Sequence, residues 1–106
     1  MRAGQLRHLV TIQTLTETNN EGNVSKYWTN TGTAYAAIEP MSGDEKQQYQ
    51  YVDGETYYNI TLRYQDINST DNRIVFDGKV FHLKNVINHD LRNVMTTCAA
   101  VTRDGD

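Results

Sequence analysis

The pair Asp77-Gly78 lies between two short runs of β-prone residues, 73–76 and 79–83. A two-residue type I′ turn requires two central residues that accept a positive φ angle, and Asp followed by Gly meets this need. Such a turn brings the two flanking runs side by side as antiparallel strands. The pair therefore predicts a β protein with a tight hairpin in its C-terminal half.

Further strands are predicted from β-prone runs that are separated by polar turns. The predicted strands cover residues 6–16, 24–30, 33–39, 55–65, 73–76, 79–87 and 94–101. Polar turns are expected at 17–23 and 66–72, with a break in the chain at 30–32, and the only proline, Pro40, ends the third run. Six or seven strands with short turns predict a mainly β fold, a small antiparallel β-barrel or a sandwich. The chain is expected to form one domain over residues 1–106, with a frayed tail at 102–106.

Residues 41–54 form a long polar connection between two of these strands. Ser42 and Glu45 have the spacing of a helix capping box, and Asp53-Gly54 is a stop signal. We therefore expect a helical turn or two, flanked by loop, with little apolar surface. Connections of this length in small β domains are usually functional or mobile, although a solvated surface insertion is the plain alternative.

The composition limits the partners and the compartment of the chain. Its 106 residues carry a net charge of −3, which does not suit a protein that grips phosphates. Only 38% of the residues are hydrophobic, so we expect neighbouring subunits to supply some of the stability. The lone cysteine, Cys98, excludes an intrachain disulfide and is predicted to be a buried structural thiol. No apolar run resembles a signal peptide or a membrane span, and no membrane partner is expected.

No catalytic or metal-binding constellation stands out in the sequence. The three histidines, His8, His82 and His89, have no metal-ligand spacing among themselves or with Cys98. Asp44 and Glu45 are adjacent carboxylates in the connection. Negative charge is favourable at the positive, N-terminal end of a helix, which explains this pair without acid–base chemistry. We expect no enzyme, no metal and no cofactor.

Aromatic residues offer two kinds of role. Trp28 is expected to pack in the core, with an interface anchor as the alternative. Four tyrosines surround the polar connection: Tyr49, Tyr51, Tyr57 and Tyr58. Stacking on nucleic-acid bases normally needs a positively charged groove, whereas this stretch is acidic. Subunit contact is at least as good an explanation of the tyrosines.

Three stretches of the chain occur in an order that resembles a known family. The first is 4–13, followed by 20–22 and Trp28. The second is 35–45, which leads into the strand that ends at 62–64. The third is 73–83, followed by Val86, 92–93 and Cys98. Together they resemble the phage head–tail joining family, the stopper or head-completion proteins of long-tailed phages. Departures from the family pattern are small and fall at Leu9 and 95–97.

The resemblance implies a small β-barrel that assembles as a ring, typically a dodecamer, below the portal and its adaptor. Such a ring closes the DNA-filled head of the virion and receives tail-completion or tail-tube proteins, after assembly in the host cytoplasm. Double-stranded DNA passes through its channel without tight binding. In relatives the insertion lines or plugs the channel, which here maps onto Ser42, Gly43, Asp44, Glu45, Lys46, Gln47, Gln48, Tyr49 and Gln50. Candidate contacts between subunits or with adjoining rings are Gly4, Leu6, Arg7, Trp28, Tyr51 and Tyr57.

Two alternatives remain open at this point. One is a tail-terminator or tail-completion ring subunit, because those proteins are also small β domains that form rings. The other belongs to a different class, a single-stranded nucleic-acid binder on an oligonucleotide-binding barrel. The acidic balance of the chain argues against the second. A small enzyme is the weakest option.

Overall fold

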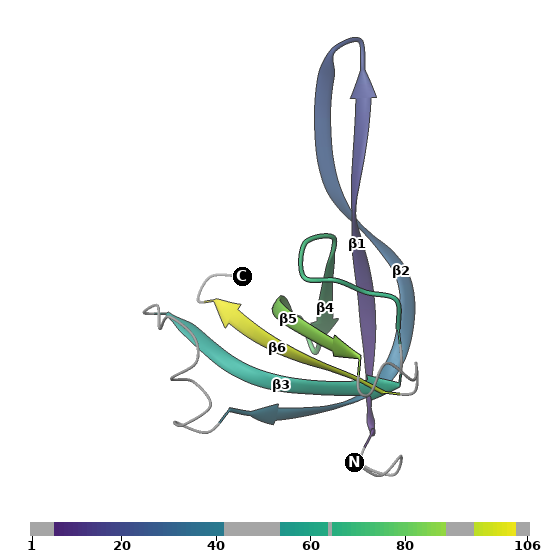
Figure 1. Ribbon diagram of the computed structural model, residues 1–106. Helices are drawn as coiled ribbons and strands as arrows, with labels where there is room; N and C mark the ends of the chain where they lie inside the picture. Colours follow the sequence, from purple (N-terminus) through teal and green to yellow (C-terminus); the bar gives the residue numbers. More distant parts are fainter. Residues whose placement is uncertain (1–5, 42–53, 64, 89–94, 104–106) are drawn as a thin grey trace.

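The computed structural model describes residues 6–41, 54–63, 65–88 and 95–103 (Figure 1). The strands are β1 (His8–Asn20), β2 (Asn23–Pro40), β3 (Glu55–Arg63), β4 (Asn72–Phe76), β5 (Lys79–Asn88) and β6 (Met95–Arg103). They pair antiparallel and close into a barrel in the order β1-β2-β3-β6-β5-β4. The predicted mainly β class and antiparallel barrel are confirmed. In the described ranges no helix is long and apolar enough to cross a membrane. The helical turn expected within 42–53 lies outside them.

Two tight turns of the same kind join neighbouring strands. Asp77 and Gly78, with φ angles of 53° and 74°, connect β4 to β5 as predicted. Glu21 and Gly22 have φ angles of 53° and 86° and connect β1 to β2. The broad turn expected at 17–23 is therefore wrong, since only two residues turn. The threonine-rich flanks, with their high β propensity, continue the ladder up to the turn.

The break expected at 30–32 is also wrong, because β2 runs through it without interruption. The pairing with β1 passes from Ile12 opposite Gly32 to Gln13 opposite Asn30. Thr31 is therefore the extra residue of a β-bulge, and its hydroxyl donates to the carbonyl oxygen of Ile12 at 3.4 Å. A bulge increases the local twist, and this one lies where the two strands leave the barrel.

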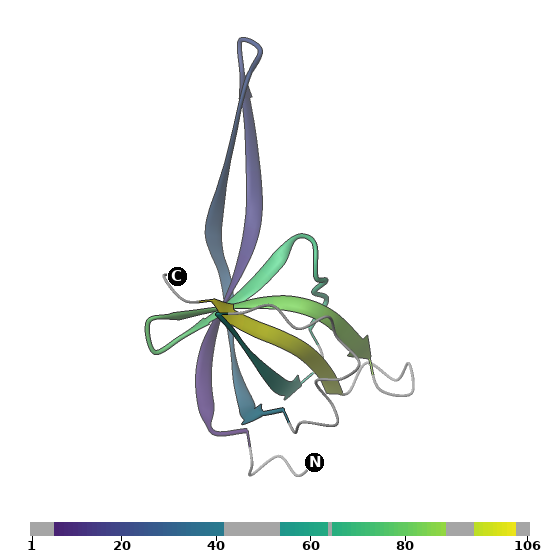
Figure 2. The same ribbon diagram turned by 90° about the vertical axis from the view of Figure 1, so that its left-hand side faces the viewer.

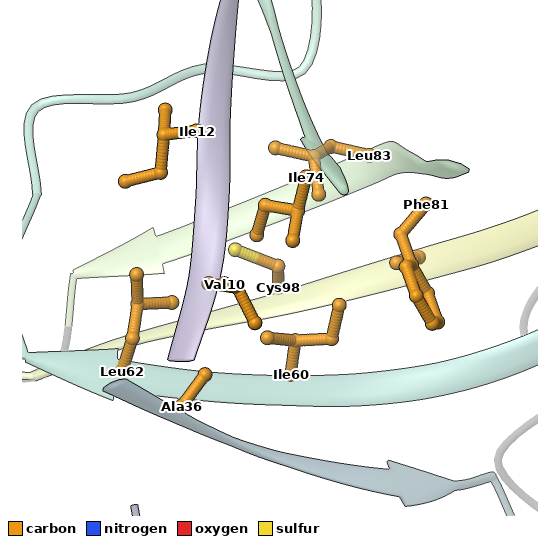
Figure 3. Packing of buried hydrophobic residues seen from close by; sticks show 10 residues of the cluster. Val10, Ile12, Ala36, Ile60, Leu62, Ile74, Phe81, Leu83 and Cys98 are labelled. Atoms are coloured by element: carbon orange, nitrogen blue, oxygen red, sulfur yellow. The ribbon is translucent and has the colours of Figure 1, made fainter. Parts of the chain in front are cut away.

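The barrel interior is filled by one hydrophobic cluster to which all six strands contribute. Inward-facing residues alternate along β3, where Ile60 and Leu62 are fully buried and Tyr58 packs against them, as the predicted alternation required. The small Ala36 and Ala100 are also fully buried, which lets their strands approach the interior closely. The buried members are Val10, Ile12, Ala36, Ile60, Leu62, Ile74, Phe81, Leu83, Cys98 and Ala100 (Figure 3).

A second, smaller cluster lies on the outer side of β3 and β6. It consists of Met41, Tyr57, Ala99 and Val101, all at most 7% exposed. Because successive side chains of a strand point to opposite faces, Tyr57 and Val101 lie on the face opposite the barrel interior. Apolar packing in this protein is therefore present on both sides of the β3–β6 pair.

The buried position of Cys98 leads to a test of the core. Its side chain is fully buried, as predicted, and this burial raises the pKa of the thiol to about 12. At pH 8 the folded protein should react with a thiol reagent about a thousandfold more slowly than the guanidinium-unfolded protein, because only the thiolate is nucleophilic. Rates measured with a chromogenic disulfide reagent check this. Equal rates in the two states would contradict the burial of Cys98.

Candidate assembly surface

The most prominent feature of the molecule is a two-stranded arm that projects from the barrel (Figures 1 and 2). β1 pairs with β4 only up to Thr14, and β2 pairs with β3 only from Ala36 onward. Residues 15–28, which we call the arm, therefore have strand partners only in each other. Beyond the hydrogen bond from the Leu15 N–H to the Asp71 carbonyl oxygen, at 2.8 Å, both outer edges of the arm carry backbone groups that no other described strand pairs.

Gln13 and Thr14 of β1 lead into the arm and form what we call its foot. Asn72, at the start of β4, fixes this foot to the barrel. Its amide nitrogen donates to the carbonyl oxygen of Gln13 at 3.3 Å and to the hydroxyl of Thr14 at 3.0 Å. Its amide oxygen accepts from the backbone N–H of Asn68 at 3.0 Å. The residue is only 8% exposed, so these bonds satisfy a polar group in a buried position. The foot of the arm is therefore held in one orientation relative to the barrel.

Arg73, the next residue of β4, makes a second set of contacts with the foot of the arm. Its Nε donates to Gln13 Oε1 at 2.6 Å, and its guanidinium lies 4.4 Å from the centre of the Trp28 ring. Gln13 in turn donates to Asn30 Oδ1 at 2.8 Å. Trp28 is half-buried in this cation–π contact and belongs to neither hydrophobic cluster. The expectation that Trp28 packs in the core is therefore wrong. Trp28 lies on the arm side of the bulge, where β2 is outside the barrel.

The surface of the arm is mostly polar and contains two exposed apolar side chains. Val24 is 53% exposed and Tyr27 is 48% exposed, on opposite faces of the ribbon. Hydroxyl pairs link the strands near the foot, at 2.8 Å for Thr14–Thr31 and 2.9 Å for Thr16–Thr29. The charged residues of the arm are Glu17, Glu21 and Lys26.

A positively charged groove of about 180 Å³ lies beside the foot of the arm. Its described lining includes Trp28, Asn72, Arg73, His82, Lys84 and Arg103, and contains no carboxylate. Arg103 is paired with Glu55 just outside the groove, with 3.0 Å between Nε and Oε2. The hydrogen bond from Arg103 is the main reason why the pKa of the Glu55 carboxyl lies below its ordinary value. The groove thus keeps a net positive charge on a chain that is acidic as a whole.

The structure places the predicted contact residues unevenly. Arg7 is exposed, whereas Leu6 is 8% and Tyr57 only 2% exposed, so the last two pack within their own subunit. Trp28 lies under Arg73 at the foot of the arm. Gly4, Tyr51 and the proposed channel residues 42–50 lie outside the described residues.

The ends of the polar connection are nevertheless well defined. Pro40 is paired with Tyr58, and the backbone N–H of Met41 donates to the carbonyl oxygen of Tyr57 at 3.1 Å. The strands that flank residues 42–53, which we call the excursion, are therefore paired with each other next to it.

Sequence reasoning missed the arm and the groove. A signal for the arm is present in the sequence, because Glu21-Gly22 is flanked by two runs rich in threonine and in other residues that favour strands. The groove has no comparable signal, since its cationic residues come from β4, β5 and β6. Only the closure of the barrel brings them together.

Comparisons with known proteins agree with this architecture. The family model for phage head completion protein matches residues 1–103. The solution structure of a protein from Shigella flexneri 2a is similar, at 27% sequence identity and a TM-score of 0.74, covering 99% of this chain and 97% of that one. A chain in the virion of a native gene transfer agent particle shares the fold at 15% identity and a TM-score of 0.69, with 92% and 94% covered. No curated protein matches the chain.

Proposed function

Because this chain belongs to the family of phage head completion proteins, we propose that it is a subunit of the ring that closes the DNA-filled head. The chain is a structural protein of the phage virion. In the proposed assembly the ring lies below the portal and its adaptor, and its far side offers the surface to which the tail attaches. A dodecamer is the proposed stoichiometry.

The observation that carries this proposal is the family match over residues 1–103, which includes the whole described barrel. The surface of the subunit supports a ring as well. A ring with rotational symmetry uses two different patches on each subunit, one that meets the next copy and one that meets the previous copy. The arm and the groove beside its foot are two such dissimilar features, one projecting and the other concave.

The excursion at residues 42–53 is the proposed channel element. Its sequence contains Asp44, Glu45 and Asp53 against the single cation Lys46. Like charge on the channel wall keeps DNA phosphates from binding as the DNA leaves the head. The paired strands β2 and β3 hold the residues on either side of this proposed element, at Pro40–Tyr58 and Met41–Tyr57.

Complementation in vitro tests the proposal against a role in tail completion. Heads should be isolated from an infection with a phage that lacks this gene, then mixed with the purified chain and with normal tails. We expect infectious particles only when the chain is added, because the heads lack their closing ring. If such heads join normal tails unaided, while tails made without the chain need it, the protein completes tails and the proposal fails.

A further inference from the structure

We propose that the arm of each subunit docks in the positively charged groove at the foot of the next subunit's arm. The occupant of the groove is thus a second copy of this chain. This inference rests on the proposed ring and specifies the two surfaces that join its subunits. Three properties of the structure lead to it: the exposure of the arm, the charges of the two surfaces, and the reach of the arm.

The arm exposes strand edges and apolar side chains to solvent. A two-stranded ribbon alone in water is at best marginally stable, and unpaired strand edges invite contact with another chain. Here the edges have no strand partner in the described part of the chain along residues 16–28, and Val24 and Tyr27 expose about half of their surface. The foot, in contrast, is fixed by Asn72 and Arg73. A rigidly held but uncovered ribbon is well suited to insert into a partner.

The charges of the two surfaces are complementary. Lys26 lies directly opposite Glu17 in the ladder and offsets its charge, whereas Glu21 stands at the turn with no cation opposite it. The tip therefore carries one uncompensated negative charge. The groove presents Arg73, Lys84 and Arg103, and the one carboxylate that interacts with Lys84 and Arg103, Glu55, offsets only part of their charge. Complementary charge of this kind fixes the register of an interface and suppresses wrong partners.

The arm is long enough to contact a neighbouring copy beyond the barrel of its own subunit. From Gln13 at the foot to Glu21 at the turn is eight residues, which span ~27 Å at about 3.4 Å per residue. The arm lies along the longest dimension of the molecule, 48 Å, and projects clear of the barrel (Figures 1 and 2). A second copy that lies against this projecting ribbon can meet the tip of the arm with its own groove. Repetition of this contact is head to tail, as a ring requires.

Disulfide trapping across subunits tests the contact directly. Glu21→Cys and Lys84→Cys are made in separate chains, mixed in equal amounts and assembled onto heads that lack the protein. The native Cys98 is fully buried and does not interfere. We expect mild oxidation to link the two variants into covalent dimers within the assembled heads. The matched control pairs Glu21→Cys with Glu39→Cys, an exposed position at the other end of β2, and should give no dimer.

Charge exchange supplies an independent measurement. Glu21→Lys and Lys84→Glu should each weaken incorporation into heads about tenfold or more, and the double variant should recover to within about threefold of the natural chain. Glu39→Lys is the control and should incorporate normally. If the natural chain completes heads but no Glu21–Lys84 dimer forms and both charge variants incorporate normally, the arm proposal is overturned while the proposed function stands. If heads do not take up the natural chain at all, both fail.

Discussion

Deletion of residues 43–52 is expected to give heads that package DNA but lose it, with a fall in infectious particles of several orders of magnitude. The reason is that these residues supply the proposed channel element, whereas the barrel does not depend on them for closure. The strands on either side remain paired at Pro40–Tyr58 and through the Met41–Tyr57 backbone hydrogen bond. After the deletion, five residues link Met41 to Tyr57, which is within the usual range for a hairpin loop.

The measurement is the fraction of DNA-filled heads by negative-stain microscopy, with nuclease protection of the packaged DNA as a second readout. A variant in which residues 43–52 are replaced by a Gly/Ser segment of equal length is the matched control for chain length. It should leak like the deletion, because it lacks the charges and side chains of the channel element. Heads that stay full and infectious with the deletion would remove the gating role. Circular dichroism of the purified deletion variant establishes that its barrel is folded.

Replacement of Ile60 by alanine is expected to lower the free energy of unfolding by about 2–5 kcal/mol. Ile60 is fully buried in the middle of β3 and belongs to the cluster that fills the barrel (Figure 3). Truncation of its side chain removes apolar contacts and leaves a cavity. The surrounding strands of a closed barrel can move only slightly, so the cavity is filled only in part. The total free energy of unfolding of a small domain is roughly 5–15 kcal/mol, so this loss is a large share of the stability.

Urea denaturation followed by circular dichroism measures this change. Ile87→Ala is a matched control, because the same side chain is 49% exposed on β5. Its effect should remain within about 0.5 kcal/mol, as is usual for surface substitutions. Equal destabilisation by the two substitutions would contradict the arrangement of the core.

Much of the barrel is predictable from the sequence because its signals are local. Asp77-Gly78 specifies a turn through the φ angles that these two residues accept, and the structure has both angles positive. The alternation along β3 places Ile60 and Leu62 inside, since the strand period is two. Cys98 between small and β-prone residues is buried, as expected.

Other features depend on contacts that the sequence does not display. The arm has no continuous apolar face, so its length is set by threonine pairing and by a two-residue turn, and a polar stretch of this kind resembles a loop. Trp28 was expected inside, but the bulge at Thr31 and the cation–π contact with Arg73 place it outside the barrel. Tyr57 was expected at a subunit contact, yet it is buried with Val101 on the outer side of β6.

The proposed channel residues 42–50 remain a prediction from the family resemblance. What the structure adds is the position of their two ends, which lie together where β2 passes into β3. The groove beside the arm is the feature that sequence reasoning could least anticipate. Its lysine and arginines are separated along the chain and become neighbours only when β5 and β6 close the barrel beside β4.

Electron cryomicroscopy of DNA-filled heads from a phage that makes no tails tests the central claim most directly. We expect a closed ring of this chain at the portal vertex, below the adaptor, and no such ring in heads made without the gene. Heads that lack such a ring, together with the presence of the chain on free tails, would contradict it.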